Sequence, residues 1–188
     1  MPSAFRELCD LCEKLEATRK RTMKIELAAA FLKDLQPSEV EPAVSMILGR
    51  AFPKWDQRTL EISWSTLSEL IQKLTQSNWD EFRKAFSETG DVGSASKAMF
   101  EVGKIRRQTT LLEKPLSILE VRRTLENIAE ASGFGSRERK ERLTQTLLSQ
   151  ASPLEVKYLI KIFIGDMRTG FHEGLMEMAV AQAFTIRL

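Results

Sequence analysis

The sequence predicts an all-α protein. Apolar residues recur through almost the whole chain with the roughly 3.6-residue period of a helix that buries one face. Glycine and proline are scarce, at 9 and 6 of 188 residues, and most of them separate the periodic segments. No segment alternates apolar and polar residues over the length of a strand ladder. With 43% hydrophobic and 29% charged residues, the chain can bury a sizeable core.

Six helices are predicted in the first part of the chain. They are expected over residues 3–17, 20–35, 38–48, 63–76, 78–88 and 93–103. Gly49 follows the third of them and is expected to be the left-handed residue that ends it. Pro42 is expected near the first turn of the same helix, where a missing N–H is tolerated. The stretch FPKWDQRTLEI (52–62) is interpreted as a loop.

The helical period breaks in QTTLLEKPL (108–116), which is expected to be extended or irregular. This segment is the best candidate for an internal boundary. Four more helices are predicted after it, over residues 117–131, 136–149, 153–164 and 173–184. The whole chain, 1–188, is therefore expected to be one domain that contains a first unit (about 1–50), a helical insert (about 51–116) and a second unit (about 117–188).

The two units resemble each other at a shift of 116 positions. PSEV, which begins at Pro37, then falls on PLEV, which begins at Pro153, and Gly49 falls on Gly165. Any two amphipathic helices match at some core positions, but a proline, a Glu-Val pair and a glycine at one fixed shift favour internal duplication. Two such units are expected to pack with pseudo-twofold symmetry.

Cations gather at the start of the predicted helix 136–149, in the stretch GFGSRERKER. A helix start is the positive end of the macrodipole, and a capping box that began at Ser136 would want an acid where Arg139 stands. A phosphate would resolve this conflict, because free N–H groups and basic side chains would converge on it. The predicted contacts in this turn are Gly133, Gly135, Ser136, Arg137, Arg139, Lys140 and Arg142.

The first unit contains an equivalent turn, ATRKRTMK (17–24), in which Lys24 falls on Lys140 at the same shift. Thr18 or Thr22 is expected to cap the helix that follows, as Ser136 is expected to cap the other. Two phosphate-binding turns related by a pseudo-dyad would suit the two antiparallel strands of a duplex. The alternative is that both turns are solvated basic surfaces. The predicted contacts in this turn are Thr18, Arg19, Lys20, Arg21 and Lys24.

Other basic candidates are weaker. Arg168 lies in GDMRTG (165–170), which matches GRAFPK (49–54), so Arg168 and Lys54 could extend the same surface. A further cluster comprises Lys104, Arg106 and Arg107. Each of these could equally be an ordinary surface charge. Because the net charge is only +2, a nucleic-acid surface has to come from such local clustering.

The two cysteines, Cys9 and Cys12, are spaced CxxC. A zinc site needs about four ligands, and His172 is the only histidine in the chain. A redox CxxC follows a strand, whereas these two cysteines lie inside a helical pattern whose apolar face is made by Phe5, Leu8, Cys12 and Leu15. They are interpreted as buried helical thiols, and no metal site is predicted.

No catalytic residue is predicted, because the chain contains no GxxxxGK[ST], HExxH or GxSxG motif. No apolar run approaches the roughly 18–20 residues of a membrane span. The N-terminal stretch MPSAFRELCDLCEKL lacks the apolar region of a secretory signal. We therefore expect a cytoplasmic protein that has no membrane partner and is monomeric.

Several stretches together resemble the N-terminal DNA-binding domain of ATP-dependent DNA ligases, of the archaeal and bacterial type. They are KIELAAAFLKDLQPSEVEPAVSMILGR (24–50), TGDVGSASK (89–97), LSILEVRRTLENIA (116–129) and SGFGSRERKERLTQTLLSQASPLEVKYLIKIFIGDMRTGFHEGLMEMAVAQAF (132–184). The resemblance covers most of the chain in order. Its last block is the most specific, with Gly-x-Gly-Ser, a basic helix, Ser-Pro-Leu-Glu and then G-x-x-R-x-G.

The resemblance implies an all-helical domain of two pseudo-symmetric halves. It implies that the partner is nicked double-stranded DNA, held through its backbone and minor groove on both sides of the nick. The family's main DNA-contacting turn corresponds to residues 133–142. Further implied partners are the adenylation and OB-fold domains, which help to encircle DNA, and the implied roles are replication, repair and recombination.

The sequence departs from a complete ligase because the family's K-x-D-G-x-R motif, which supplies the nucleophilic lysine, is absent from its 188 residues. We expect the chain to be part of a longer enzyme, to bind DNA and not to join it. No cofactor is expected in this chain, while ATP and Mg²⁺ are implied for the parent enzyme. The runner-up interpretation is an all-helical protein-interaction scaffold whose basic turns are solvated.

Overall fold

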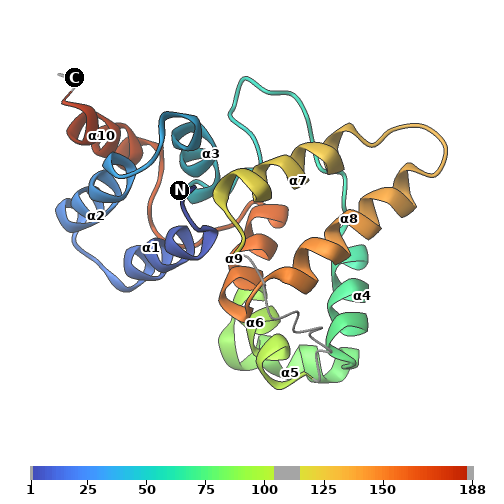
Figure 1. The fold of residues 1–188 in the computed structure, drawn as a ribbon. Helices are drawn as coiled ribbons and strands as arrows, with labels where there is room; N and C mark the ends of the chain where they lie inside the picture. Colours follow the sequence, from blue (N-terminus) through green and yellow to red (C-terminus); the bar gives the residue numbers. More distant parts are fainter. Residues whose placement is uncertain (1, 104–114, 186–188) are drawn as a thin grey trace.

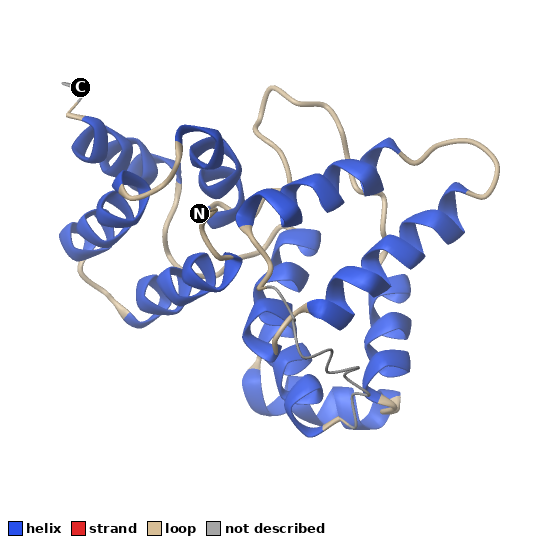
Figure 2. Cartoon of the chain, viewed as in Figure 1, coloured by secondary structure: helices blue, strands red, loops and turns tan. Residues whose placement is uncertain are grey.

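The structure is a computed structural model that describes residues 2–103 and 115–185 (Figure 1). Within these ranges the chain forms helices and loops, and its one strand-like contact is an isolated bridge between Ala4 and Ser117 (Figure 2). The helices are α1 (Phe5–Ala17), α2 (Arg21–Lys33), α3 (Pro37–Ile47), α4 (Trp64–Thr75), α5 (Trp79–Thr89), α6 (Val92–Val102), α7 (Ile118–Glu130), α8 (Ser136–Gln150), α9 (Pro153–Ile164) and α10 (Glu173–Phe184). The all-α prediction is confirmed, and each predicted helix overlaps one of these.

Two sequence predictions concern residues that the structure does not describe. Lys104, Arg106 and Arg107 lie outside the described residues, as does most of the segment 108–116.

Local hydrogen bonds explain why the helix boundaries lie close to the predicted ones. Five helices begin with a side chain that accepts a hydrogen bond from the backbone N–H three residues later; these caps are Ser63, Asn78, Asp91, Ser117 and Ser152. Caps of this kind are worth about 1 kcal/mol each. Gly49, at φ +77°, follows the end of α3 as predicted, and Gly165 ends α9 in the same left-handed region.

Pro42 is not near the first turn of its helix. Because α3 begins at Pro37, Pro42 lies in the interior of the helix, where it is buried. A proline there has no N–H to donate to the carbonyl of Ser38. The capping interactions before Pro42 and the buried residues Met46 and Ile47 after it hold the helix together across that missing bond.

The helices pack in pairs that cross between the two halves of the sequence. α2 packs against α10 and α8 against α4, while α1 contacts α9 and α7 contacts α3. If α1–α4 and α7–α10 are treated as equivalent sets, which adds α4 from the predicted insert to the first unit, each of these contacts has a counterpart in which the sets are exchanged. Two units related by a pseudo-twofold axis would pack in this way, although the duplication itself stays a prediction.

The core runs through the whole described structure as one cluster of buried side chains. Phe5, Cys9 and Cys12 of α1 are fully buried in it, as the interpretation of the cysteines as helical thiols requires. Burial raises the pKa of Cys12 to about 12 and that of Cys9 well above its ordinary value. Both thiols therefore stay protonated at neutral pH, which confirms the predicted packing role.

Candidate nucleic-acid interface

Two left-handed glycines build the start of α8. Gly133 has φ +78° and Gly135 has φ +74°, and a Cβ built on either would meet no atom within 4 Å. Gly135 occupies the N-cap position, and no side chain caps the helix. The prediction that Ser136 is the cap is therefore wrong, because the left-handed Gly135 makes the turn and Ser136 is already helical. The third helical position then belongs to Glu138.

Three arginines extend from the first two turns of α8. Arg137, Arg139 and Arg142 are all exposed. Arg137 donates to Glu141 on the next turn at 2.9 Å. Within the described residues, neither Arg139 nor Arg142 forms an ion pair. An uncapped helix start with two free guanidinium groups favours an anionic ligand.

Lys140 points into the protein. Its side chain is only 7% exposed, and its ammonium donates to the Leu60 carbonyl at 3.2 Å and to the Glu61 carboxylate at 2.8 Å. Thr144 and Leu147, one and two turns later on the same face, are buried as well. The helical period therefore contained a signal for this burial that the charge clustering obscured. Lys140 does not belong to the exposed basic turn in which it was predicted.

The equivalent turn before α2 is also uncapped by side chains. Lys20 is the N-cap of α2, and Thr18 is the C-cap of α1. The prediction that Thr18 or Thr22 caps α2 is wrong, because the chain is extended from Thr18 to Lys20 and Thr22 lies inside the helix. Arg19, Lys20 and Arg21 are exposed.

Lys24 is buried in the same manner as Lys140. Its ammonium donates to the Thr169 carbonyl at 2.6 Å, in the loop after α9. Next to this bond, a Cβ on Gly170 would lie 2.8 Å from the Lys24 ammonium nitrogen. Lys24 thus holds the loop after α9, and Lys140 holds the loop after α3. Both lysines, which were predicted as surface contacts, join the two halves of the molecule.

The two weaker candidates, Lys54 and Arg168, are exposed but already have carboxylate partners. Lys54 donates to Glu173 at the start of α10, and this hydrogen bond lowers the pKa of Glu173. Arg168, at φ +51°, donates to Asp166 at 2.7 Å and to the Gly90 carbonyl at 2.9 Å. A phosphate would have to compete with these partners.

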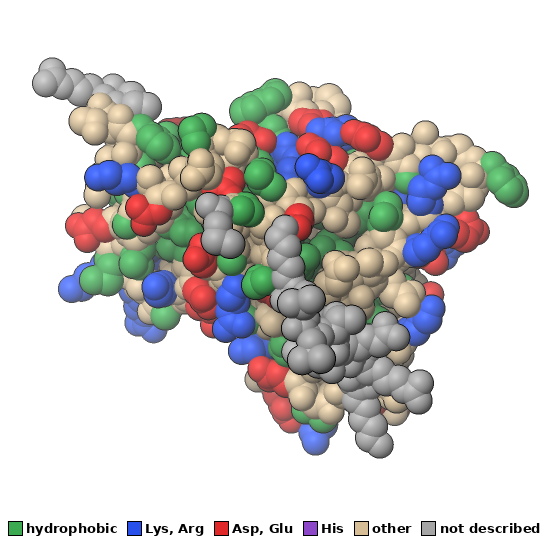
Figure 3. Space-filling view, in the orientation of Figure 1, with side chains coloured by type: hydrophobic (Ala, Val, Ile, Leu, Met, Phe, Trp, Pro, Cys, Tyr) green, Lys and Arg blue, Asp and Glu red, His purple; other side chains and the backbone are tan. Residues whose placement is uncertain are grey.

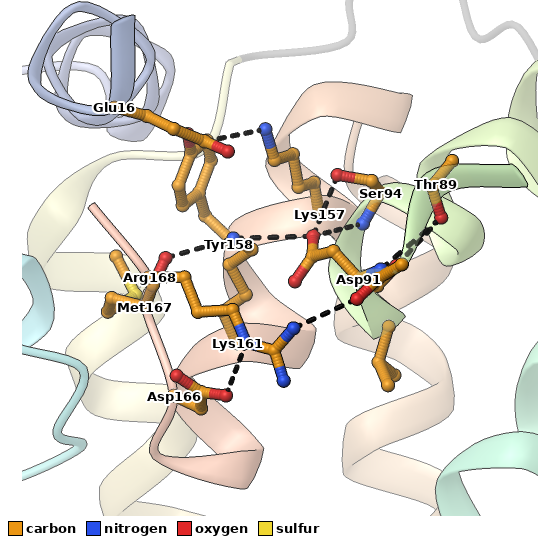
Figure 4. A network of polar contacts seen from close by, with 12 residues as sticks. Glu16, Thr89, Asp91, Ser94, Lys157, Tyr158, Lys161, Asp166, Met167 and Arg168 are labelled. Carbon is orange, nitrogen blue, oxygen red and sulfur yellow. Dashed lines mark hydrogen bonds and ion pairs between the residues drawn. The ribbon is translucent and has the colours of Figure 1, made fainter. Parts of the chain in front are cut away.

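A buried network explains the TGDVGSASK stretch (89–97), and Figure 4 shows how its side chains converge. Asp91 accepts from the backbone N–H and the hydroxyl of Ser94, and it pairs with Lys161 of α9 at 3.3 Å. Lys161 is 2% exposed and also donates to the Met167 carbonyl at 2.9 Å. Lys161 therefore connects Asp91 of this stretch to Met167 in the loop after α9.

Close packing of α6 on α9 depends on Gly93, where a Cβ would lie 2.7 Å from the Lys157 carbonyl oxygen. On its other side, α9 is tied to α1, because Lys157 and Tyr158 both donate to Glu13. The sequence reasoning missed this network. The signal in the sequence was the presence of Lys157 and Lys161 within a largely apolar helix.

The two basic turns lie far apart. In Figure 1 the turn between α1 and α2 and the loop between α7 and α8 are at opposite ends of the molecule. Figure 3 shows Lys and Arg side chains towards both ends of this face. The described residues contain no group of three or more His, Cys, Asp or Glu side chains that could hold a metal ion. No described helix is long and apolar enough to cross a membrane.

These features define the class as an all-α domain whose exposed cations gather at two distant, uncapped helix starts. The chain belongs to the DNA ligase N-terminal domain family: the family model described as "DNA ligase N terminus" matches residues 4–181. The chain is 34% identical over 183 residues to a DNA ligase of Thermococcus onnurineus and 36% identical over 183 residues to one of Methanopyrus kandleri. Each match covers 97% of this chain but only 32% of the relative.

Proposed function

We propose that this chain is a sequence-nonspecific, duplex DNA-binding domain of an ATP-dependent DNA ligase. It grips the phosphate backbone and the minor groove around a nick, so that the parent enzyme can seal the nick in replication, repair and recombination. Membership of the DNA ligase N-terminal family supports this proposal, as do the relatives that are DNA ligases.

The observation that carries the proposal is the start of α8. Its N-cap is a left-handed glycine, no side chain caps it, and Arg139 and Arg142 are exposed on its first two turns. A backbone phosphate would receive the N–H groups, the favourable end of the helix dipole and two guanidinium groups at once. Contacts of this kind position a protein on DNA without reading its sequence.

The turn before α2 provides a second anchor. Arg19, Lys20 and Arg21 are exposed at an uncapped helix start, at the far end of the molecule from α8 (Figure 1). We assign one turn to the DNA on each side of the nick. Thr18, Ser136 and the two glycines, Gly133 and Gly135, supply close backbone approach, whereas Lys24 and Lys140 act inside the protein.

Binding to nicked duplex across a salt series tests this proposal. If about four to six phosphates are neutralised, log K against log[salt] has a slope of about −4 to −5. Changing Arg137, Arg139 and Arg142 to alanine is expected to weaken binding equally on unrelated sequences and to flatten the slope by about 2 to 3. Fluorescence anisotropy on labelled duplexes measures both quantities.

The matched control removes three exposed cations elsewhere, Lys33, Arg83 and Lys84, and is expected to leave the slope within about one of the wild-type value. An α8 triple variant that behaves like this control would remove the α8 turn from the interface. If the chain retains no duplex even at low salt, the scaffold interpretation is favoured.

We assign the remaining ligase functions to parts of the parent enzyme outside this chain. Those are the adenylation and OB-fold domains, which supply the nucleophilic lysine and bind ATP and Mg²⁺. Because K-x-D-G-x-R is absent from its 188 residues, this chain alone binds DNA without joining it.

A further inference from the structure

Phe134 is the most exposed large hydrophobic residue described. Its relative exposure is 107%, compared with 86% for Val102 and 78% for Trp55. It lies between Gly133 and Gly135 in the loop that joins α7 to α8. In Figure 1 this loop extends beyond the helices, and Figure 3 shows hydrophobic atoms at that outer end of the molecule.

The Phe134 ring is fully exposed, and a glycine stands on each side of it. The glycines on both sides are left-handed, and the space next to each of them is open to beyond 4 Å. The nearest core residue before the loop is Ala131, and after it the chain enters α8 directly. An aromatic ring that is fully in water offers a large apolar contact area to a binding partner.

The surroundings of Phe134 indicate the chemistry of its partner. Arg137, Arg139 and Arg142 follow it on the first two turns of α8, and all three are exposed. Arg137 is paired with Glu141, and Arg139 and Arg142 remain as cations beside the ring. A partner that combines negative charge with an apolar crevice would engage both the cations and the ring. The minor groove of duplex DNA does so, because phosphates line its rims while deoxyribose rings and base-pair edges form its walls.

We infer that Phe134 inserts into the minor groove of the bound duplex, where its ring packs against sugars and partly unstacks one base step. This inference rests on the proposed DNA-binding function and adds an apolar wedge to it. Apolar side chains inserted in this way kink duplexes in other minor-groove binders. The ring has no hydrogen-bonding group, so it suits a protein that must act on any sequence.

The test compares Phe134→Ala with wild type on nicked duplex. Affinity is expected to fall about tenfold, which corresponds to about 1.4 kcal/mol. The slope of log K against log[salt] is expected to stay unchanged, because no phosphate contact is lost. Phe134→Leu, which keeps an apolar wedge, is expected to retain most of the affinity. Phe86→Ala is the control, since Phe86 is also exposed, at 40%, but lies on α5.

A second readout reports insertion directly. With 2-aminopurine placed at successive positions of the duplex, wild type and Phe134→Leu are expected to raise its fluorescence at one step, and Phe134→Ala is not. Wild-type affinity in Phe134→Ala, with normal salt dependence in both proteins, would overturn the wedge and leave the proposed function standing. A partner other than DNA would be expected for the ring in that case. If wild type itself shows no salt-dependent binding, the proposed function fails and the wedge fails with it.

Discussion

In the sequence, Lys24 and Lys140 belong to the two basic turns. In the structure, both side chains are buried. Each donates to a backbone carbonyl of a distant loop, Lys24 to Thr169 and Lys140 to Leu60. The chain therefore divides the cations of each turn between two tasks. The arginines and Lys20 are exposed, although Arg137 is paired with Glu141, while one lysine in each turn is buried against the other half.

A substitution of Lys140 separates these two tasks. Lys140→Met keeps the apolar stem but removes the donor to the Leu60 carbonyl, so the free energy of unfolding is expected to fall by about 1 kcal/mol. The pKa of Glu61, which the hydrogen bond from Lys140 lowers, is expected to return to its ordinary value. Urea unfolding measures the first effect and NMR titration the second.

DNA binding by Lys140→Met is expected to keep the wild-type salt slope. Arg139→Met is the matched control, because it lies on the same turn and is exposed; it is expected to flatten the slope by about one. An equal loss of slope in both variants, without loss of stability in Lys140→Met, would restore Lys140 as a phosphate contact.

At the scale of elements, α9 is held by contacts with two other helices. It packs against α6 through Gly93 and against α1 through Lys157 and Tyr158. Its buried Lys161 is neutralised by Asp91 at 3.3 Å. Removing one partner from a buried pair is costly, because the remaining charge is left without compensation.

Asp91 gives this packing a pH dependence with a definite sign. Burial acts to raise the pKa of Asp91, but hydrogen bonds from Ser94 and the charge of Lys161 lower it below its ordinary value. A carboxyl with a depressed folded-state pKa stabilises the protein above its unfolded-state pKa of about 4. That contribution is lost as the pH falls through the folded-state pKa.

Asp91→Asn is therefore expected to lower the free energy of unfolding by about 3 kcal/mol at pH 7. Asparagine still caps α6, so the loss reports the pair with Lys161 and not the cap. The difference from wild type should shrink as the pH falls below about 4, in urea titrations run from pH 3 to 7. Asp80→Asn, an 88% exposed control, should differ little from wild type at any pH. A constant Asp91→Asn deficit across this range would argue against a charged Asp91 in the fold.

At the scale of the whole molecule, the two basic turns are far from each other. They lie at opposite ends (Figure 1), and the lysine of each is bonded to the loop that follows the third helix of the other half. The core that connects them is continuous across the described residues. This arrangement makes the spacing between the turns a property of the fold and not of either turn alone.

The two turns are expected to contribute independently to DNA binding. Changing Arg19, Lys20 and Arg21 to alanine should flatten the salt slope by about 2 to 3, and adding the α8 triple change should remove most of the remainder, because well-separated sites are additive. Salt titrations of the two triple variants and the sextuple variant measure this. If the first-turn triple variant binds like wild type, only the α8 end contacts DNA.

The sequence by itself determined the helices and where the charges lie along the chain. Helical period, capping residues and helix-ending glycines act over a few residues, so the all-α class and each helix were predicted from local pattern. The caps of α8 and α2 and the placing of Pro42 were misjudged, and so was the exposure of Lys24 and Lys140. The exposed arginines of both turns were also named correctly as surface cations, although their role in binding stays a prediction.

The tertiary structure decided which of those charges can meet a partner. Lys140 bonds to a residue 80 positions away and Lys24 to one 145 positions away, and no local pattern specifies such a pairing. The opposite placement of the two turns likewise follows from how distant helices pack (Figure 1). Periodicity describes one helix at a time, whereas burial depends on the neighbour that a helix finds only once the whole chain has folded.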